Sequence, residues 1–187
     1  MRFVPAVTGF LRGFARLLDA IGVVERVFGV FLIALIVVTI TIQVFTRYAL
    51  NYPIVWVEEL ATYAFIWGAF VGAALGHKRQ RHIRIDTFVA RLGPRGVAAF
   101  RLLANALALV LMLLLASTAL RVMGIESRSR SIALPIDIPR MWFYSVPLFV
   151  SVASMAVTSV YFILREARAL ATGVAEPGIA GAGGSIA

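Results

Sequence analysis

Residues 27–46 read VFGVFLIALIVVTITIQVFT, a run of 20 residues without a charged side chain or a histidine, flanked by Arg26 and Arg47. An α-helix rises about 1.5 Å per residue, so such a run can cross the roughly 30 Å hydrocarbon core of a bilayer. The run does not alternate between apolar and polar residues, which excludes a strand of a membrane β-barrel. It therefore predicts a transmembrane helix.

Three later runs share this character. They contain 17, 19 and 24 residues and cover 60–76, 102–120 and 141–164. Helices of a soluble bundle would need polar faces, and these runs show almost none. The sequence therefore predicts an all-α integral membrane protein with four transmembrane helices. The expected spans are about 27–47, 54–77, 97–120 and 140–164, within a transmembrane domain of residues 27–171.

The composition supports a membrane protein and narrows its chemistry. Of the 187 residues, 61% are hydrophobic and 14% are charged, whereas soluble domains have about 45–50% apolar and about 25% charged residues. There is no cysteine, which excludes disulfides, thiolate metal sites and iron–sulfur clusters. Both histidines, His77 and His82, lie outside the apolar runs, so haem ligation between spans is not expected. We predict no cofactor, no metal site and no catalytic residue.

The basic residues indicate which side of the membrane each loop occupies. The net charge is +9, and most Lys and Arg side chains lie before the first run, between the second and third, and after the fourth. Positive charge collects on the cytoplasmic side, so both termini are predicted to be cytoplasmic. Because these charges alternate with apolar runs, they indicate a membrane surface and not a nucleic acid. We expect a multi-pass membrane protein.

Three segments outside the spans have recognisable patterns. Residues 1–26 carry apolar residues at helical spacing, which predicts an amphipathic helix on the cytoplasmic surface. A second short surface helix is expected after Asp86, where Ile85, Phe88 and Leu92 share a face. Residues 172–187 are rich in Gly and Ala and predict a flexible cytoplasmic tail.

The first candidate functional residues lie at the beginning of the second predicted span. Pro53 is expected at the first helical position, and Trp56, Glu58 and Glu59 follow it. Two adjacent carboxylates can hold a cation, pair with an arginine of another helix or subunit, or simply face water. Arg47 is the nearest basic residue within the chain for such a pair. We therefore predict a partner interface here, with solvation as the open alternative.

Two further sets of residues have a physical rationale. Helix association in lipid depends on close backbone approach, so small residues at a spacing of four predict a packing seam on the second span; they are Ala64, Gly68, Gly72 and Gly76. Basic side chains beside a membrane attract anionic headgroups. The set predicted to hold phospholipid headgroups consists of Lys78, Arg79, Arg81, Arg84 and Arg91.

Polar residues inside the spans are few. Gln43 in the first span and Asn105 in the third are expected to hydrogen-bond neighbouring helices. Pro147 is a candidate kink in the fourth span. No run carries an acid or a base near its middle, where transport sites and proton relays usually have one. The chain alone is therefore predicted to be a poor transporter.

Several motifs together resemble a known family. Residues 51–60 read NYPIVWVEEL, residues 82–86 read HIRID, and Trp142 and Pro147 follow at the fourth span. Over about residues 25–165 the chain resembles the small membrane subunit, of Q or DctQ type, of tripartite ATP-independent periplasmic (TRAP) transporters.

This resemblance implies a role. The chain would be the non-catalytic small subunit of a sodium-coupled system that takes up an organic acid, and it would lie in a bacterial inner membrane. Its expected partners are a large membrane subunit, which it would scaffold, and a periplasmic substrate-binding protein. Two alternatives remain open at this point: a self-sufficient homo-oligomeric transporter or channel, and a membrane anchor of a redox enzyme.

Overall fold

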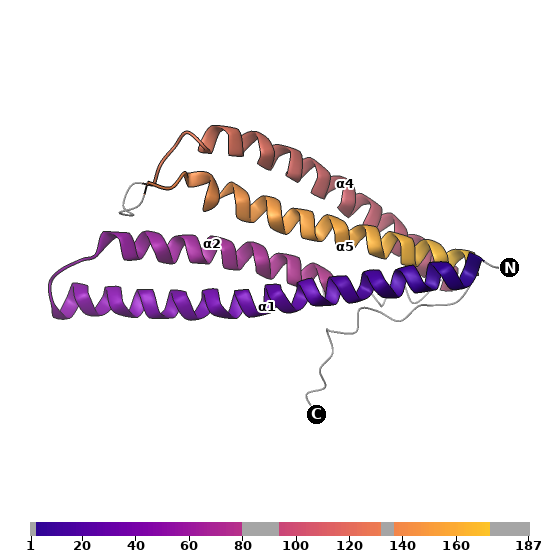
Figure 1. The fold of residues 1–187 in the computed structure, drawn as a ribbon, viewed down its shortest axis with the longest axis horizontal. Coiled ribbons are helices and arrows are strands. Elements are labelled where there is room, and N and C mark those ends of the chain that lie inside the picture. Colours follow the sequence, from indigo (N-terminus) through magenta and orange to yellow (C-terminus); the bar gives the residue numbers. More distant parts are fainter. Residues whose placement is uncertain (1–2, 80–93, 132–136, 173–187) are drawn as a thin grey trace, which may run out of the picture. The chain divides into compact units, whose positions relative to one another are not determined.

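The computed structural model describes residues 3–79, 94–131 and 137–172, which are almost entirely helical (Figure 1). The elements are α1 (Phe3–Ala49), α2 (Val55–Lys78), α4 (Pro94–Glu126), the 3₁₀ turn η1 (Arg140–Trp142) and α5 (Ser145–Thr172). Within these residues, four helices are long and apolar enough to cross a membrane. The predicted all-α fold with four spans is therefore confirmed, while the cytoplasmic location of both termini stays a prediction.

Helix α1 joins the expected surface helix and the first span without a break. Its 47 residues correspond to about 70 Å of helix, so part of it must extend beyond a hydrocarbon core of about 30 Å. No proline interrupts residues 6–52, so the backbone has no local reason to stop near Arg26. The helix ends where Asn51 adopts a left-handed φ of 52°, a conformation that asparagine tolerates better than most residues.

Many large apolar side chains along the spans are exposed to an extent that would be unfavourable in water. Val30, Ile33 and Val37 of α1 are each at least 60% exposed, and Leu103 and Leu107 of α4 are similarly open. Leaving apolar surface in water costs about 25 cal/mol per Å². Lipid or a partner helix therefore covers these faces in the membrane.

The chain divides into two compact units, and each long helix contributes to both. Unit 1 contains Met1–Val24, Ala74–Leu114 and Ala153–Ala187, and unit 2 contains Glu25–Ala73 and Leu115–Val152. In unit 1, the N-terminal part of α1 packs on α5, because Leu11 and Leu18 are buried against Tyr161 and Phe162. Part of the apolar stripe predicted for residues 1–26 is thus covered by α5.

Unit 2 has a core built on the first half of α2. Tyr63 is 2% exposed and its ring stacks on Phe143, with centroids 3.9 Å apart and planes 6° apart. Tyr144 meets the same ring edge-on at 5.7 Å. This aromatic group fixes the start of the fourth span against α2.

Several expected boundaries shift. Helix α2 begins at Val55, two residues after Pro53, so Pro53 precedes the helix. Pro147 is the third residue of α5, where a backbone N–H needs no helical partner; the expected kink is therefore unnecessary. The surface helix predicted after Asp86 and the tail at 173–187 lie outside the described residues.

Candidate partner interface

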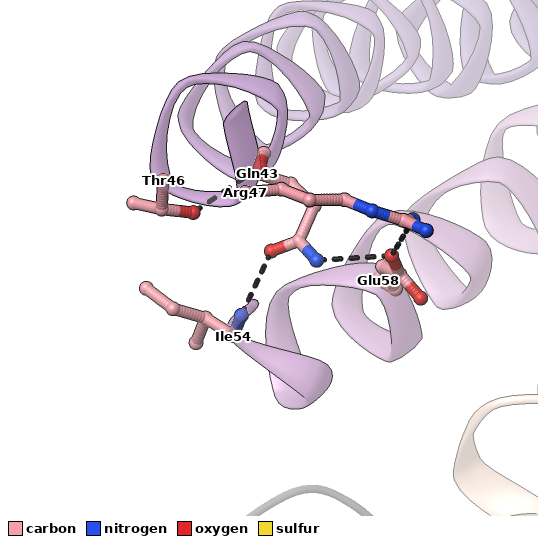
Figure 2. Close-up of polar contacts among 5 residues, drawn as sticks. All are labelled: Gln43, Thr46, Arg47, Ile54 and Glu58. Carbon is pink, nitrogen blue, oxygen red and sulfur yellow. Dashed lines mark hydrogen bonds and ion pairs between the residues drawn. The ribbon is translucent and has the colours of Figure 1, made fainter. Parts of the chain in front are cut away.

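Gln43 of α1 connects the first span to the start of α2 (Figure 2). Its side-chain amide donates to Glu58 Oε1 at 2.9 Å, and its amide oxygen accepts the backbone N–H of Ile54 at 3.3 Å. The side chain is buried, so both ends of the amide are satisfied where water is scarce. The predicted hydrogen bond from Gln43 to a neighbouring helix is confirmed.

Arg47 lies one helical turn beyond Gln43 and pairs with the same carboxylate. Its Nη1 is 3.8 Å from Glu58 Oε1, and the two side chains are 59% and 53% exposed. This is a loose, solvent-accessible pair, of a kind that stabilises a protein by only about 0–1 kcal/mol. The pairing of Arg47 with one of the two glutamates, considered from sequence, is therefore present.

Glu59 faces a different part of the molecule. Adjacent residues on a helix point about 100° apart, and Glu59 accepts hydrogen bonds from the hydroxyls of Tyr63 and Ser131. The Ser131 oxygen is 2.8 Å from Glu59 Oε1. The two neighbouring carboxylates thus have separate functions: Glu58 connects to α1, and Glu59 holds the segment after α4.

The described residues of that segment, 127–131 and 137–139, include paired backbone. Arg130 and Pro139 form an antiparallel bridge, and Arg130 Nε lies 3.3 Å from Asp137 Oδ1. The sequence had suggested a longer loop from Arg121, but α4 continues to Glu126. Tyr63, Phe143 and Ser131 were not singled out from sequence, because nothing local to them signals a contact with Glu59 or with one another.

The two tryptophans of α2 have different environments. Trp67 donates its ring N–H to the carbonyl of Trp142 at 3.1 Å and meets the ring of Phe28 edge-on at 5.7 Å. Trp56 is 42% exposed. Trp67 therefore belongs to the internal packing of unit 2, whereas Trp56 is exposed.

The small residues of the predicted seam differ in how closely other parts of the chain approach them. Ala64 is buried, and a Cβ placed on Gly68 would lie 4.0 Å from Leu32 Cβ. A Cβ on Gly72 or Gly76 would meet nothing within 4 Å among the described residues. Gly68 thus lies close to α1, while Gly72 and Gly76 have space for a side chain among the described residues.

The basic residues that follow the seam also differ in their environments. Lys78 is 5% exposed, and its ammonium group donates to Ser154 Oγ at 2.8 Å. His77 Nε2 lies 2.9 Å from Ser159 Oγ. Lys78 therefore ties α2 to α5 inside unit 1, which does not favour headgroup contact. Arg79 is half-buried, and the predicted headgroup residues Arg81, Arg84 and Arg91 lie outside the described residues.

One prediction about a polar residue in the spans was wrong. The Asn105 side chain donates to the carbonyl of Arg101 at 2.8 Å, four residues back on its own helix. An asparagine side chain can hydrogen-bond a backbone carbonyl of the preceding turn of its own helix. In the described ranges no three His, Asp or Glu side chains gather to hold a metal ion.

Comparison with known proteins places these features in one family. Residues 36–169 match the family model described as the DctQ component of tripartite ATP-independent periplasmic transporters. The chain is 30% identical over 129 residues to the sialic acid TRAP transporter small permease protein SiaQ of Vibrio cholerae, covering 67% of this chain and 72% of SiaQ. It is 32% identical over 79 residues to a candidate TRAP transporter small permease protein of Haemophilus influenzae, covering 42% of this chain and 49% of that protein. The chain is therefore a multi-pass membrane protein of the DctQ family, the small permease subunits of TRAP transporters.

Proposed function

We propose that this chain is the non-catalytic scaffold subunit of a sodium-coupled transporter in a bacterial inner membrane. The large membrane subunit would carry the substrate path, and a periplasmic binding protein would deliver an organic acid. The name of the Vibrio cholerae relative supports an acidic sugar or similar carboxylate as the substrate class. The small subunit would brace the large one and help to position the binding protein.

The observation that carries this proposal is where the polar side chains of α1 and α2 point. Gln43 and Glu58 bond to each other, and Glu59 bonds to Tyr63 and Ser131. These contacts tie helices and loops together near the ends of the spans. A transport site would need polar groups converging near the middle of the membrane. The arrangement therefore supports a scaffold role for this chain more than a substrate path through it.

The partner surface would include the open half of the seam, at Gly72 and Gly76, together with exposed Trp56. Small residues permit close approach of a second helix in lipid, and aromatic residues are enriched at membrane–water boundaries. On the opposite side of the membrane, Arg79, Arg81, Arg84 and Arg91 would hold phospholipid headgroups.

Replacing Gly72 by Leu should leave folding of the chain intact but impair its assembly with the large subunit. A Cβ at this position meets nothing within 4 Å in the described parts of the chain, and glycine in a helix interior is the less stable residue by roughly 0.5–1 kcal/mol. The variant should therefore unfold at least as late as the parent chain in detergent, but recover little large subunit on co-purification. Ala73→Leu, at the exposed neighbouring position, is the matched control. Equal recovery of large subunit by both variants would contradict the seam.

Uptake in proteoliposomes tests the function itself. Vesicles with both membrane subunits, an external binding protein loaded with substrate and an inward sodium gradient should accumulate substrate. Omitting this chain, or replacing sodium by potassium, should abolish accumulation. Flux through vesicles that hold this chain alone would instead establish a self-sufficient transporter. Undiminished uptake without the chain would contradict the scaffold role.

A further inference from the structure

An open groove runs along α1 and α2 within unit 2. It has a volume of about 510 Å³, inside the range of roughly 300–1,000 Å³ that ligand pockets occupy. Its apolar walls come from both helices: Ile36, Ile40, Val44, Ala61 and Phe65. Its polar residues are Gln43, Arg47, Glu58 and Thr62, with Tyr48 beside them.

The length of the groove matches one leaflet of a bilayer. On α1 it extends from Ile36 to Tyr48, which is about 18 Å of helix. Half of a hydrocarbon core is about 15 Å. Arg47 and Tyr48 occur at the end of the span, where charged and aromatic side chains meet the headgroups. The remaining α1 wall runs toward the middle of the span and is apolar apart from Gln43. One acyl chain lying along this wall would therefore bring its headgroup to Arg47.

The charged side chains at the end of the groove restrict which lipid headgroup it could bind. Arg47 and Glu58 are each more than half exposed and lie 3.8 Å apart, beyond hydrogen-bonding distance (Figure 2). Both described contacts of the Glu58 carboxylate use Oε1, so Oε2 can accept from a new donor. A guanidinium binds a phosphate through paired N–H groups, and a carboxylate accepts hydrogen bonds from a primary ammonium. The pair thus complements one negative and one positive group held close together.

We infer that the groove binds a single phospholipid with a phosphoethanolamine headgroup. Its phosphate would lie on Arg47, its ammonium group on Glu58, and one acyl chain along Ile40 and Val44. A choline headgroup has no N–H to donate to Glu58, and a glycerol headgroup has no cation. This inference is independent of the proposed transport role, since it concerns the α1–α2 surface of the chain itself.

Native mass spectrometry of the full chain tests the inference with lipids of identical acyl chains. Phosphatidylethanolamine should bind about tenfold more tightly than phosphatidylcholine or phosphatidylglycerol, the expected value of one charge-assisted hydrogen bond. Glu58→Gln should remove most of this preference, and Arg47→Gln should weaken binding of all three lipids. Arg128→Gln, an exposed arginine outside the groove, should change nothing. Equal binding of the three lipids by the parent chain would overturn the assignment.

Two variants separate the lipid from other occupants. Ile40→Trp should fill the groove and lower binding of every lipid, whereas Val37→Trp, on an exposed part of α1 outside the groove, should not. Because the chain has no cysteine, Ile40→Cys provides a unique site for cross-linking in membranes. A cross-link from this position to the large subunit or to a second copy of the chain would show a protein in the groove and would overturn the lipid assignment.

Discussion

Replacing Glu166 by Ala should destabilise the chain by about 3–5 kcal/mol, because it removes the carboxylate from a buried ion pair and keeps the guanidinium buried. Arg165 Nη2 lies 2.6 Å from Glu166 Oε1, and the two side chains are only 8% and 6% exposed. The guanidinium also lies over the ring of Phe162 at 5.0 Å, so Arg165 is held in place when its partner is removed. The apparent Tm in detergent should fall by roughly 6–20 °C for a chain of this size.

Two controls identify burial as the cause. The double variant Arg165→Met with Glu166→Leu removes both charges and should cost far less than Glu166→Ala alone, since apolar residues often replace a buried ion pair without loss. Asp137→Asn breaks an ion pair whose side chains are 53% and 79% exposed, and should shift stability by about 0–1 kcal/mol. If Glu166→Ala and Asp137→Asn had the same small effect, the α5 pair would not be buried in the membrane protein.

Replacing Glu59 by Leu should cost about 2–4 kcal/mol. The variant removes the carboxylate that accepts from the Tyr63 and Ser131 hydroxyls, and a hydrogen bond to a charged group contributes about 1.5–3 kcal/mol. Tyr63 is almost fully buried, so water cannot easily replace the carboxylate. Thermal unfolding in detergent measures the loss.

A double-mutant cycle isolates the hydrogen bond from Tyr63. Tyr63→Phe removes the donor while keeping the ring stacked on Phe143, so it should cost little once Glu59 is already Leu. Glu59→Gln keeps an oxygen acceptor and is expected to be mild. Strictly additive effects of Glu59→Leu and Tyr63→Phe would show that the two side chains do not interact.

The spans were predictable because lipid imposes a strong and local rule. A helix must keep charges out of the hydrocarbon core, so charged residues such as Arg26, Arg47 and Arg101 border the runs that the structure shows as helices. The continuity of α1 was not predicted. A charged residue such as Arg26 marks a change of environment, but only a proline or a comparable break would end the helix there.

The contacts around α2 were less predictable because they depend on distant residues. Helical geometry alone separates Glu58 from Glu59, but their partners differ: one lies on α1, and the other, Ser131, is 72 residues away. Lys78 illustrates the same limit. Its position in a basic sequence suggested the membrane surface, yet Ser154 of α5 provides an internal acceptor, so the side chain is buried.

The small-residue seam of α2 shows what a sequence pattern can and cannot predict about helix packing. Four small residues at a spacing of four indicate a face suited to close packing, but they do not identify the helix that packs there. The structure assigns Gly68 a neighbour on α1 and leaves Gly72 open. The pattern therefore contains an internal contact and a free surface that look identical in sequence.

Co-purification from the native membrane tests the subunit assignment most directly. The tagged chain would be extracted in mild detergent with its lipids retained, and its companions identified by mass spectrometry. Our account predicts a stoichiometric large polytopic membrane subunit bound to this chain. Recovery of the chain alone, or only as a homo-oligomer, under these conditions would contradict it.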